Sequence, residues 1–299
     1  MSSGARTPAA GAPPPYSAFA LPEGGPPGTM IAMAFGRLPE IDSTRPHPAR
    51  MWNYWIGGKD YYPIDQEVGE QIAAAFPGVG DIARHSRVCL GRMVRHLVAE
   101  EGVRQFIDIG TGLPTHDNTH EVAQRVAPEC RVVYVDNDPL VLLHARALLA
   151  GRSEGRTDYI ECDVRDPGRI LAESARTLDF DRPIGLILFG IMGNVIDDDE
   201  SLAIVRRLVD ALPPGSFMAF NDGTGVLDRE GREEAIRLAV EQGSTPYVAR
   251  TPEEIARYFT GLELLEPGIV STSRWRPEAT PFGPPPEVDA TCALARKVS

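Results

Sequence analysis

A short apolar run that ends in an acid and a glycine turn holds the first residues of the chain that could do chemistry. The run Arg104–Ile109 contains Asp108 near its end and is followed by Gly110, Thr111 and Gly112. Glycines here let the backbone turn sharply and pass close to a ligand, where a Cβ atom would collide with it. We therefore expect Asp108, Gly110, Thr111 and Gly112 to line a binding site.

A second apolar run has the same form and ends in Asp136, which is followed by Asn137. Runs as short as Val132–Val135, rich in valine and aromatic residues, are typical of buried strands in a parallel sheet. An acid at the end of the strand after a glycine turn is placed to accept hydrogen bonds from both hydroxyls of a ribose. The two runs together predict half of a nucleoside-binding site. The alternative is an ordinary strand-to-helix turn that happens to contain two glycines.

The glycine pattern distinguishes between two kinds of nucleoside ligand. A dinucleotide site needs a third glycine three residues after the second, and a helix that starts at once to meet the pyrophosphate. Here Thr115 holds that position, and Asn118 with Glu121 forms a capping-box pattern that starts the helix late. The loop Gly110–Asp117 therefore favours a ligand without phosphate, and an NAD-dependent oxidoreductase is the less favoured alternative.

Two further apolar runs also end in polar or glycine residues. Ligands bind beyond the carboxyl ends of the strands in an open parallel sheet, so these positions should lie near the same site. Asp163 can hold the amino group of an adenine beside the backbone of Val164, or it can cap the helix that follows. Gly190 and Asn194 follow the next run, and Asn194 can orient a nucleophile or cap a helix.

The segment 45–63 is dense in aromatic residues, although only 7% of the whole chain is aromatic. The pair Gly57-Gly58 breaks any helix that starts earlier in this segment. Aromatic residues beside a double glycine suit a lid that closes over a ligand, and a hydrophobic clasp that ties the segment to the domain is an equal alternative. Tyr54 and Asp60 are the candidates here for accepting a proton from a substrate. The aromatic residues are Trp52, Tyr54, Trp55, Tyr61 and Tyr62.

The composition excludes several classes of function. The net charge of −12 argues against general affinity for nucleic acid, which needs clustered Lys and Arg. The four cysteines form no C-x-x-C pair and no metal-ligand spacing, which predicts reduced, mostly buried thiols in a cytoplasmic protein and no metal site. No apolar run approaches the roughly 20 residues that span a bilayer, so we expect no membrane association.

Composition and periodicity divide the chain into three parts. Residues 1–40 are rich in Pro, Gly and Ala, and we expect a disordered tail there. Residues 41–100 should form an N-terminal helical cap with the aromatic lid, and residues 101–299 the ligand-binding domain. In that domain strands and helices alternate, which predicts a mostly parallel α/β sheet of Rossmann-like form. The expected strands are 104–109, 131–136, 157–162, 184–189 and 216–221, with a C-terminal antiparallel hairpin of 262–266 and 291–298.

Three motifs occur together and in order, and their conjunction resembles a known family. They run from Ala49-Arg50-Met51 to Gly57-Gly58-Lys59-Asp60, from Phe106 to Pro114 with Asn118-Thr119-His120-Glu121, and from Val132 to Pro139. They are similar to a family of S-adenosyl methyltransferases whose substrates are unassigned. The glycine turn also resembles the motif of class I S-adenosylmethionine-dependent methyltransferases, whose loop holds the amino acid end of the cofactor.

The resemblance implies S-adenosylmethionine as cofactor and methyl transfer to a small-molecule acceptor. It implies a class I methyltransferase sheet, with the transferable methyl near Gly190–Asn194. The family usually carries a histidine-containing segment after the fourth strand, where this chain has Met192-Gly193-Asn194. Acid–base chemistry inherited at that point is therefore not expected here. A non-catalytic protein that only binds S-adenosylmethionine is the alternative from another class of function.

Overall fold

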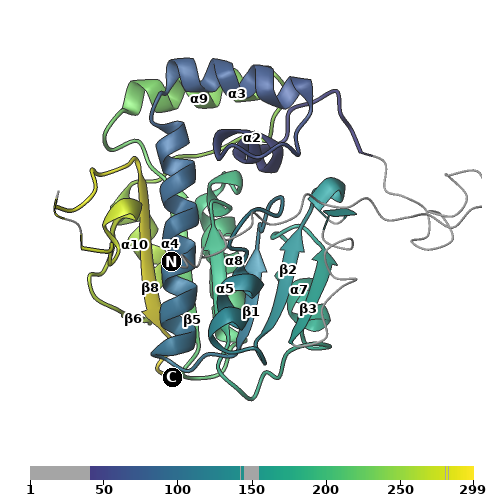
Figure 1. Cartoon of the computed structure of the whole chain (residues 1–299), viewed down its shortest axis with the longest axis vertical. Coiled ribbons are helices and arrows are strands. Elements are labelled where there is room, and N and C mark those ends of the chain that lie inside the picture. Colours follow the sequence, from purple (N-terminus) through teal and green to yellow (C-terminus); the bar gives the residue numbers. More distant parts are fainter. Residues whose placement is uncertain (1–40, 142, 145–154, 280, 282) are drawn as a thin grey trace, which may run out of the picture. The chain divides into compact units, whose positions relative to one another are not determined.

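The computed structural model describes residues 41–141, 143–144, 155–279, 281 and 283–299 (Figure 1). The tail expected over residues 1–40 lies outside these ranges. The sequence also predicts a helix that Asp138 caps and that runs to Ala150. Most of this helix lies outside the described ranges, and residues 139–141 and 143–144 are helical.

A mixed sheet runs through the centre of the described chain in the strand order β3-β2-β1-β4-β5-β8-β6, and β7 also pairs with β8. The first five strands of the sequence pair in parallel, as expected, and β8 runs antiparallel to β5. The order reverses between β1 and β4, which is where such sheets bind ligands. The strands are β1 (Gln105–Ile109), β2 (Arg131–Asp136), β3 (Arg156–Glu161), β4 (Gly185–Phe189), β5 (Phe217–Gly223), β6 (Glu263–Leu264), β7 (Val270–Ser271) and β8 (Ala290–Arg296).

The antiparallel pairing expected at the C-terminus is confirmed between β6 and β8, where Glu263 lies opposite Arg296. The sequence did not indicate that β8 would also insert beside β5 over seven residue pairs. All seven residues of β5 and the first six of β8 are buried. Burial on both faces explains why these segments lack a regular alternation of polar and apolar residues.

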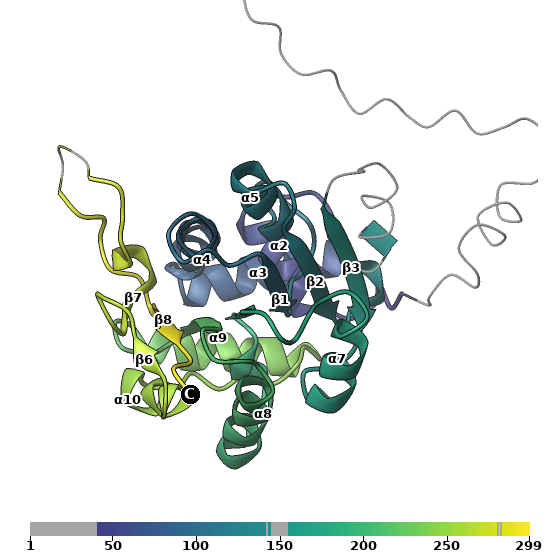
Figure 2. The same ribbon diagram turned by 90° about the horizontal axis from the view of Figure 1, so that it is seen from below.

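Helices cover both faces of the sheet (Figure 2). The long helix α4 and the shorter α5 cover one face, where Met93 and Leu97 pack against Phe106 and Tyr134. Helices α7 and α8 cover the other face, with Ile170 and Leu208 in its core. These helices are α4 (Val79–Ala99), α5 (Thr119–Val126), α7 (Pro167–Ser174) and α8 (Asp198–Asp210).

A third group of helices lies across the carboxyl ends of the strands (Figure 1). Its small core joins α2 and α3 to α9, with Met51, Ile72, Phe76 and Ala235 buried together. Asp65 fixes the start of this layer, because its carboxylate accepts the backbone N–H groups of His47 and Tyr62 at 2.9 and 2.8 Å. The helices are α2 (Pro48–Trp55), α3 (Pro63–Ala75) and α9 (Arg229–Glu241).

The remaining elements are short. They are η1 (Met192–Asn194), α10 (Pro252–Ala256), η2 (Arg257–Phe259) and η3 (Thr272–Arg274). The four cysteines are free and buried, which confirms that part of the sequence prediction. Among the described residues, no helix combines the length and the apolar character needed to cross a membrane, and no cluster of His, Cys, Asp and Glu could hold a metal ion.

Candidate functional site

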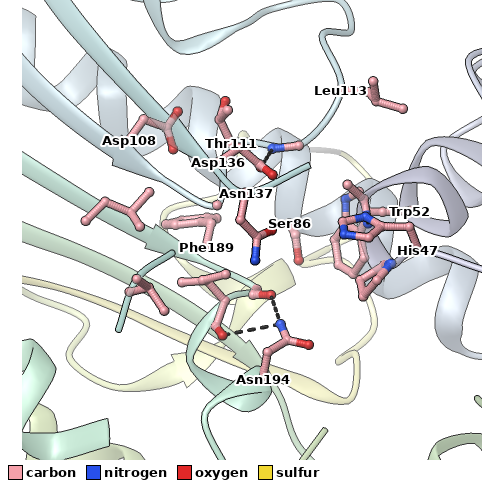
Figure 3. A pocket seen from close by; sticks show the side chains of 18 of the residues that line it. His47, Trp52, Ser86, Asp108, Thr111, Leu113, Asp136, Asn137, Phe189 and Asn194 are labelled. Atoms are coloured by element: carbon pink, nitrogen blue, oxygen red, sulfur yellow. Dashed lines mark hydrogen bonds between the residues drawn. The ribbon is translucent and has the colours of Figure 1, made fainter. Parts of the chain in front are cut away.

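A cavity of about 150 Å³ opens beyond the carboxyl ends of β1, β2, β3 and β4, under the helix α2 (Figure 3). Because the carboxyl ends of parallel strands share one edge of the sheet, positions far apart in the sequence meet there. All nine residues predicted to hold a nucleoside cofactor belong to its wall: Asp108, Gly110, Thr111, Gly112, Asp136, Asn137, Asp163, Val164 and Gly190.

The glycine turn has the backbone that the sequence requires. Gly110 and Gly112 have φ angles of +73° and +65°, which side-chain-bearing residues rarely adopt. A Cβ on Gly110 would lie 2.9 Å from the side chain of Ile191, so packing also excludes one there. A Cβ on Gly112 would meet no atom within 4 Å. Gly112 therefore leaves open space at the cavity wall, which suits a ligand that passes close to the backbone.

Asp136 is the central acid of the cavity and is 6% exposed. One carboxylate oxygen accepts the backbone N–H of Gly112 at 2.8 Å and the other that of Asp138 at 2.9 Å. Burial raises the pKa of Asp136, and these two backbone hydrogen bonds oppose that shift. A carboxylate has about four acceptor positions, so each oxygen can accept one more hydrogen bond. That arrangement matches the two hydroxyls of a ribose.

Asp138 links this strand end to the cap. It is 1% exposed, and its carboxylate pairs with Nε and Nη2 of Arg50 at 3.1 and 3.0 Å. Nδ1 of His47 lies 3.3 Å from the same carboxylate. The sequence indicated Asp138 as a helix cap, and it does accept the N–H of Leu140 at 3.0 Å. Its partnership with Arg50 fixes α2 above the cavity, and the sequence did not indicate that role.

Asp108 lies deeper, at the base of the glycine turn. It is 3% exposed and accepts a hydrogen bond of 2.6 Å from the hydroxyl of Thr119 at the start of α5. Burial raises its pKa to about 6, although the hydrogen bond from Thr119 and the charge of Arg87 act in the opposite direction. Asp108 thus holds the glycine turn and α5 in one arrangement.

Asp163 and Asn194 do not cap the helices that follow them, so this alternative from the sequence is wrong for both residues. The N-cap of α7 is Asp166, which accepts the N–H of Arg169, and the N-cap of α8 is Asp197. Asp163 instead accepts hydrogen bonds from Nδ2 of Asn137 at 3.1 Å and from the backbone N–H and the guanidinium of Arg165 at 2.9 and 3.3 Å. Asn194 uses its Nδ2 on the carbonyls of Gly190 and Ile191, at 3.5 and 3.3 Å (Figure 3). Both side chains belong to the cavity wall, and Asp163 is already held by Asn137 and Arg165.

Tyr54 and Asp60 lie apart from the wall of this cavity. The hydroxyl of Tyr54 donates to Glu70 at 3.2 Å, and its ring packs against that of Tyr61 in a T-shaped, edge-to-face arrangement. The side chain of Asp60 is 43% exposed and 3.9 Å from that of His144. With about 3.6 residues per turn, the face of α2 that carries Trp52 cannot also carry Tyr54. The proton-accepting role expected for Tyr54 and Asp60 gains no support from these positions.

The helix α2 instead presents other residues to the cavity: Pro48, Ala49, Trp52 and Asn53. Trp55 lies elsewhere on the helix and donates from Nε1 to the carbonyl of Gly69 in α3 at 3.1 Å. The aromatic segment therefore combines both alternatives from the sequence. Trp52 covers the cavity, and Trp55 acts as a clasp between two helices.

Sequence reasoning missed Ser86, which faces the cavity from α4 (Figure 3). It is 4% exposed, and its hydroxyl has no hydrogen-bond partner within the described part of the chain. A buried hydroxyl without a partner is unfavourable, so it suits a site that a polar ligand completes. The available signal was a single serine within the apolar stripe of α4. Its neighbour Arg87 also lines the cavity and donates from Nη2 to Oδ1 of Asn118 at 3.0 Å.

A second cavity, of about 120 Å³, adjoins the first. Apolar side chains of α2, α3, α4 and α9 form most of its wall, and the end of β5 and Tyr247 close it. The residues common to both cavities are Pro48, Trp52, Gly190, Asn194, Asn221 and Thr245. Two ligands placed in the two cavities would therefore meet at this shared wall.

Comparison with known proteins identifies the family to which this chain belongs. Residues 36–298 match the S-adenosyl methyltransferase family. The chain is 44% identical to a DUF574-family protein of Streptomyces avermitilis, with a TM-score of 0.82 over 86% of this chain and 100% of that one. It is 38% identical to a protein of Thermobifida fusca proposed to be a methyltransferase, with a TM-score of 0.78 over 86% of this chain and 97% of that one. No protein of curated function matches. The chain therefore belongs to the S-adenosyl methyltransferase family and is an S-adenosylmethionine-dependent methyltransferase.

Proposed function

We propose that this enzyme transfers the methyl group to a small-molecule acceptor, with the cofactor in the first cavity and the acceptor in the second. The observation that carries the proposal is the position of Asp136. This buried carboxylate keeps one acceptor position free on each oxygen beside the open turn at Gly112. The adjoining second cavity gives an acceptor access to the same site.

The cofactor-binding residues follow from this placement. Asp136 accepts hydrogen bonds from the ribose hydroxyls, and the turn of Gly110, Thr111 and Gly112 holds the amino acid end. Asp163 and the backbone of Val164 hold the adenine, with Asn137 fixing the carboxylate of Asp163. The unpartnered hydroxyl of Ser86 supports a polar ligand group at its side of the cavity.

The residues around the shared wall align the reactants and exclude water. When bound, S-adenosylmethionine supplies a methyl group activated by a positively charged sulfur. Methyl transfer is a direct displacement, so alignment and exclusion of water account for most of the catalytic effect. Trp52 offers an aromatic face, which attracts such a cation, and Asn194 orients the acceptor across the passage. Residues 41–100 act as the cap over both ligands, and residues 101–299 as the cofactor-binding domain.

The size and composition of the second cavity support a small molecule as the acceptor. A volume of about 120 Å³ between α2, α3, α4 and α9 suits a ring-sized body better than a polymer. The net charge of −12 gives no support for a nucleic acid substrate. Four buried free thiols support a reducing compartment such as the cytoplasm.

Calorimetric titration with S-adenosylhomocysteine and with NADH tests the cofactor placement. We expect S-adenosylhomocysteine to bind and NADH to give no signal. Incubation with methyl-labelled S-adenosylmethionine and a fractionated cell extract should then label a small-molecule fraction. Binding without any transfer of label would favour the non-catalytic alternative, and binding of NADH in its place would overturn the proposal.

A further inference from the structure

The wall of the second cavity is mainly apolar and aromatic. Trp52 and Trp55 of α2 and Phe76 after α3 contribute rings, and Ile82 of α4 and Ala239 of α9 contribute aliphatic groups. Burial of apolar surface contributes about 25 cal/mol for each Å², so this wall favours a body without charge. The apolar wall thus selects the size and the apolar character of the acceptor. The polar residues of the same cavity select the group on the acceptor that receives the methyl.

Two amide side chains stand at the shared wall, on either side of Gly190. The N–H of Gly190 donates to the backbone carbonyl of Asn221 at 2.8 Å, and its carbonyl accepts from Nδ2 of Asn194 at 3.5 Å. Asn221 is 1% exposed, and its Nδ2 donates to the hydroxyl of Thr272 at 2.6 Å. In the described chain, neither amide oxygen receives a hydrogen bond. Both oxygens are therefore open acceptors at the shared wall, available to donors on a ligand.

The described residues that line the second cavity include no histidine, lysine or cysteine. The carboxylate of Asp222 belongs to its wall but is already occupied. It accepts the N–H groups of Gly193 and Gly223 at 2.6 and 3.1 Å and the hydroxyl of Tyr247. A hydroxyl acceptor would need a base to remove its proton, and the described residues that line the second cavity offer no free base. A neutral amine needs none.

We propose that the acceptor is an amine on an apolar, ring-sized body, and that Asn194 and Asn221 hold its nitrogen. The proposal rests on the proposed function of the two cavities. A primary amine can offer one N–H to each amide oxygen, whereas a hydroxyl has a single hydrogen and a carboxylate has none.

The reaction balances without a catalytic base. The nitrogen lone pair forms the new bond to the methyl carbon, and the carbon–sulfur bond breaks with its electron pair passing to sulfur. The product ammonium later loses its extra proton to water. The two amide oxygens and the charge of Asp222 stabilise the positive charge that develops on nitrogen.

Arg232 also reaches this wall, but its position gives little support for an anionic acceptor. Its Nε and Nη2 donate to the carbonyls of Thr224 and Asp289 at 2.8 and 2.9 Å. Its guanidinium lies 4.4 Å from the centre of the Phe76 ring. These contacts fix the group in place between α9 and the sheet, so its main role is to hold the wall together.

Three compounds with one carbon skeleton test the reacting group: aminoindane, indanol and indane carboxylate. Each is titrated into the full chain saturated with S-adenosylhomocysteine, at mildly alkaline pH, with tryptophan fluorescence as the readout. We expect aminoindane to bind at least roughly tenfold more tightly than indanol, because indanol has a single hydrogen and leaves one of the two amide oxygens without a donor. Indane carboxylate should bind most weakly.

Two matched pairs of variants locate the binding. Ala239→Phe fills the second cavity from α9, whereas Val240→Phe changes the next residue, which is 43% exposed. Only Ala239→Phe should abolish aminoindane binding, with S-adenosylhomocysteine binding intact in both. Asn194→Leu should remove the preference for the amine over indanol, whereas Asn194→Asp, which keeps oxygen acceptors, should retain it.

The outcomes separate this inference from the proposed function. Equal affinity for the three compounds, tightest binding of the carboxylate, or no binding of aminoindane would overturn the amine acceptor, while binding of S-adenosylhomocysteine would leave the cofactor placement standing. Failure to bind S-adenosylhomocysteine would overturn both. Transfer of label to indanol but not to aminoindane would also contradict the inference.

Discussion

Arg50 and Asp138 form a two-point ion pair, with nitrogen–oxygen distances of 3.1 and 3.0 Å, and both side chains are almost fully buried. Arg50 belongs to α2, and Asp138 lies two residues beyond the ribose-binding candidate Asp136. The pair therefore couples α2 to the strand end that we propose binds the cofactor. Removing Arg50 would leave the buried charge of Asp138 without its two-point partner, with only Nδ1 of His47 nearby at 3.3 Å.

Arg50→Met should lower the free energy of unfolding by about 3–5 kcal/mol, the usual effect of breaking a buried ion pair. Arg84→Met is the matched control, because Arg84 pairs with Asp81 on the exposed surface of α4. It should change stability little. Urea denaturation followed by circular dichroism measures both, and equal losses in the two variants would contradict a special role for Arg50.

Asp136→Ala should weaken binding of S-adenosylhomocysteine by at least roughly tenfold, since a hydrogen bond to a charged group contributes about 1.5–3 kcal/mol. Glu161→Ala is the control. Glu161 pairs with Asp136 at the end of the neighbouring strand, but it is exposed and does not belong to the cavity wall. Calorimetry should show unchanged affinity for this variant. Unchanged affinity of Asp136→Ala for S-adenosylhomocysteine would show that Asp136 does not bind the ribose.

Trp52→Leu should weaken binding of S-adenosylmethionine more than binding of S-adenosylhomocysteine, because only the former carries a positive charge. The expected difference is about 0.5–2 kcal/mol, the range of cation–π attraction. Tyr54→Phe removes only a hydrogen bond to Glu70 and should leave both affinities unchanged. If Tyr54→Phe lost affinity for the cofactor and Trp52→Leu did not, Tyr54 and not Trp52 would belong to the cofactor site.

Asp108 should make stability fall as the pH rises. Burial raises its folded-state pKa to about 6, above the value of 3.8 for an unperturbed carboxyl. Between these values the folded protein binds the proton more tightly, so its contribution is present below about pH 4 and is lost by about pH 6. Asp108→Asn cannot titrate, so the stability of wild type relative to this variant should fall by up to about 3 kcal/mol over that window.

A second variant, Thr119→Val, also tests the titration of Asp108. The hydroxyl of Thr119 lowers the pKa of Asp108, so removing this hydroxyl should move the upper end of the pH window to higher pH. Urea denaturation at a series of pH values measures all three proteins. A constant difference between wild type and Asp108→Asn would show that Asp108 keeps one protonation state.

Most of the sheet could be predicted because its strands are short apolar runs with a single polar or glycine end. Asp108, Asp136 and Asp163 are sequence-distant, but parallel pairing brings their strand ends to one edge. The start of α5 followed in the same way from the capping-box pattern of Asn118 and Glu121. Local chemistry was sufficient at these positions.

The cap could not be predicted to the same depth, because it depends on which face of each helix turns inward. The aromatic density around Tyr54 was visible, but only Trp52 and Trp55 reach a cavity. Ser86 was one serine in an apolar stripe. Tyr247 reaches the second cavity only because the chain after α9 returns across the end of β5, where its hydroxyl meets Asp222. No pattern within the sequence encodes that return.

The wall that the two cavities share has a consequence for kinetics. Gly190, Asn194 and Asn221 contact whatever occupies either cavity, so the first ligand to bind orders part of the surface that the second requires. Such coupling is reciprocal: each ligand must raise the affinity of the other by the same factor. Initial-rate patterns should therefore show synergy between the substrates. Demethylated cofactor should form a dead-end ternary complex when the acceptor is in excess.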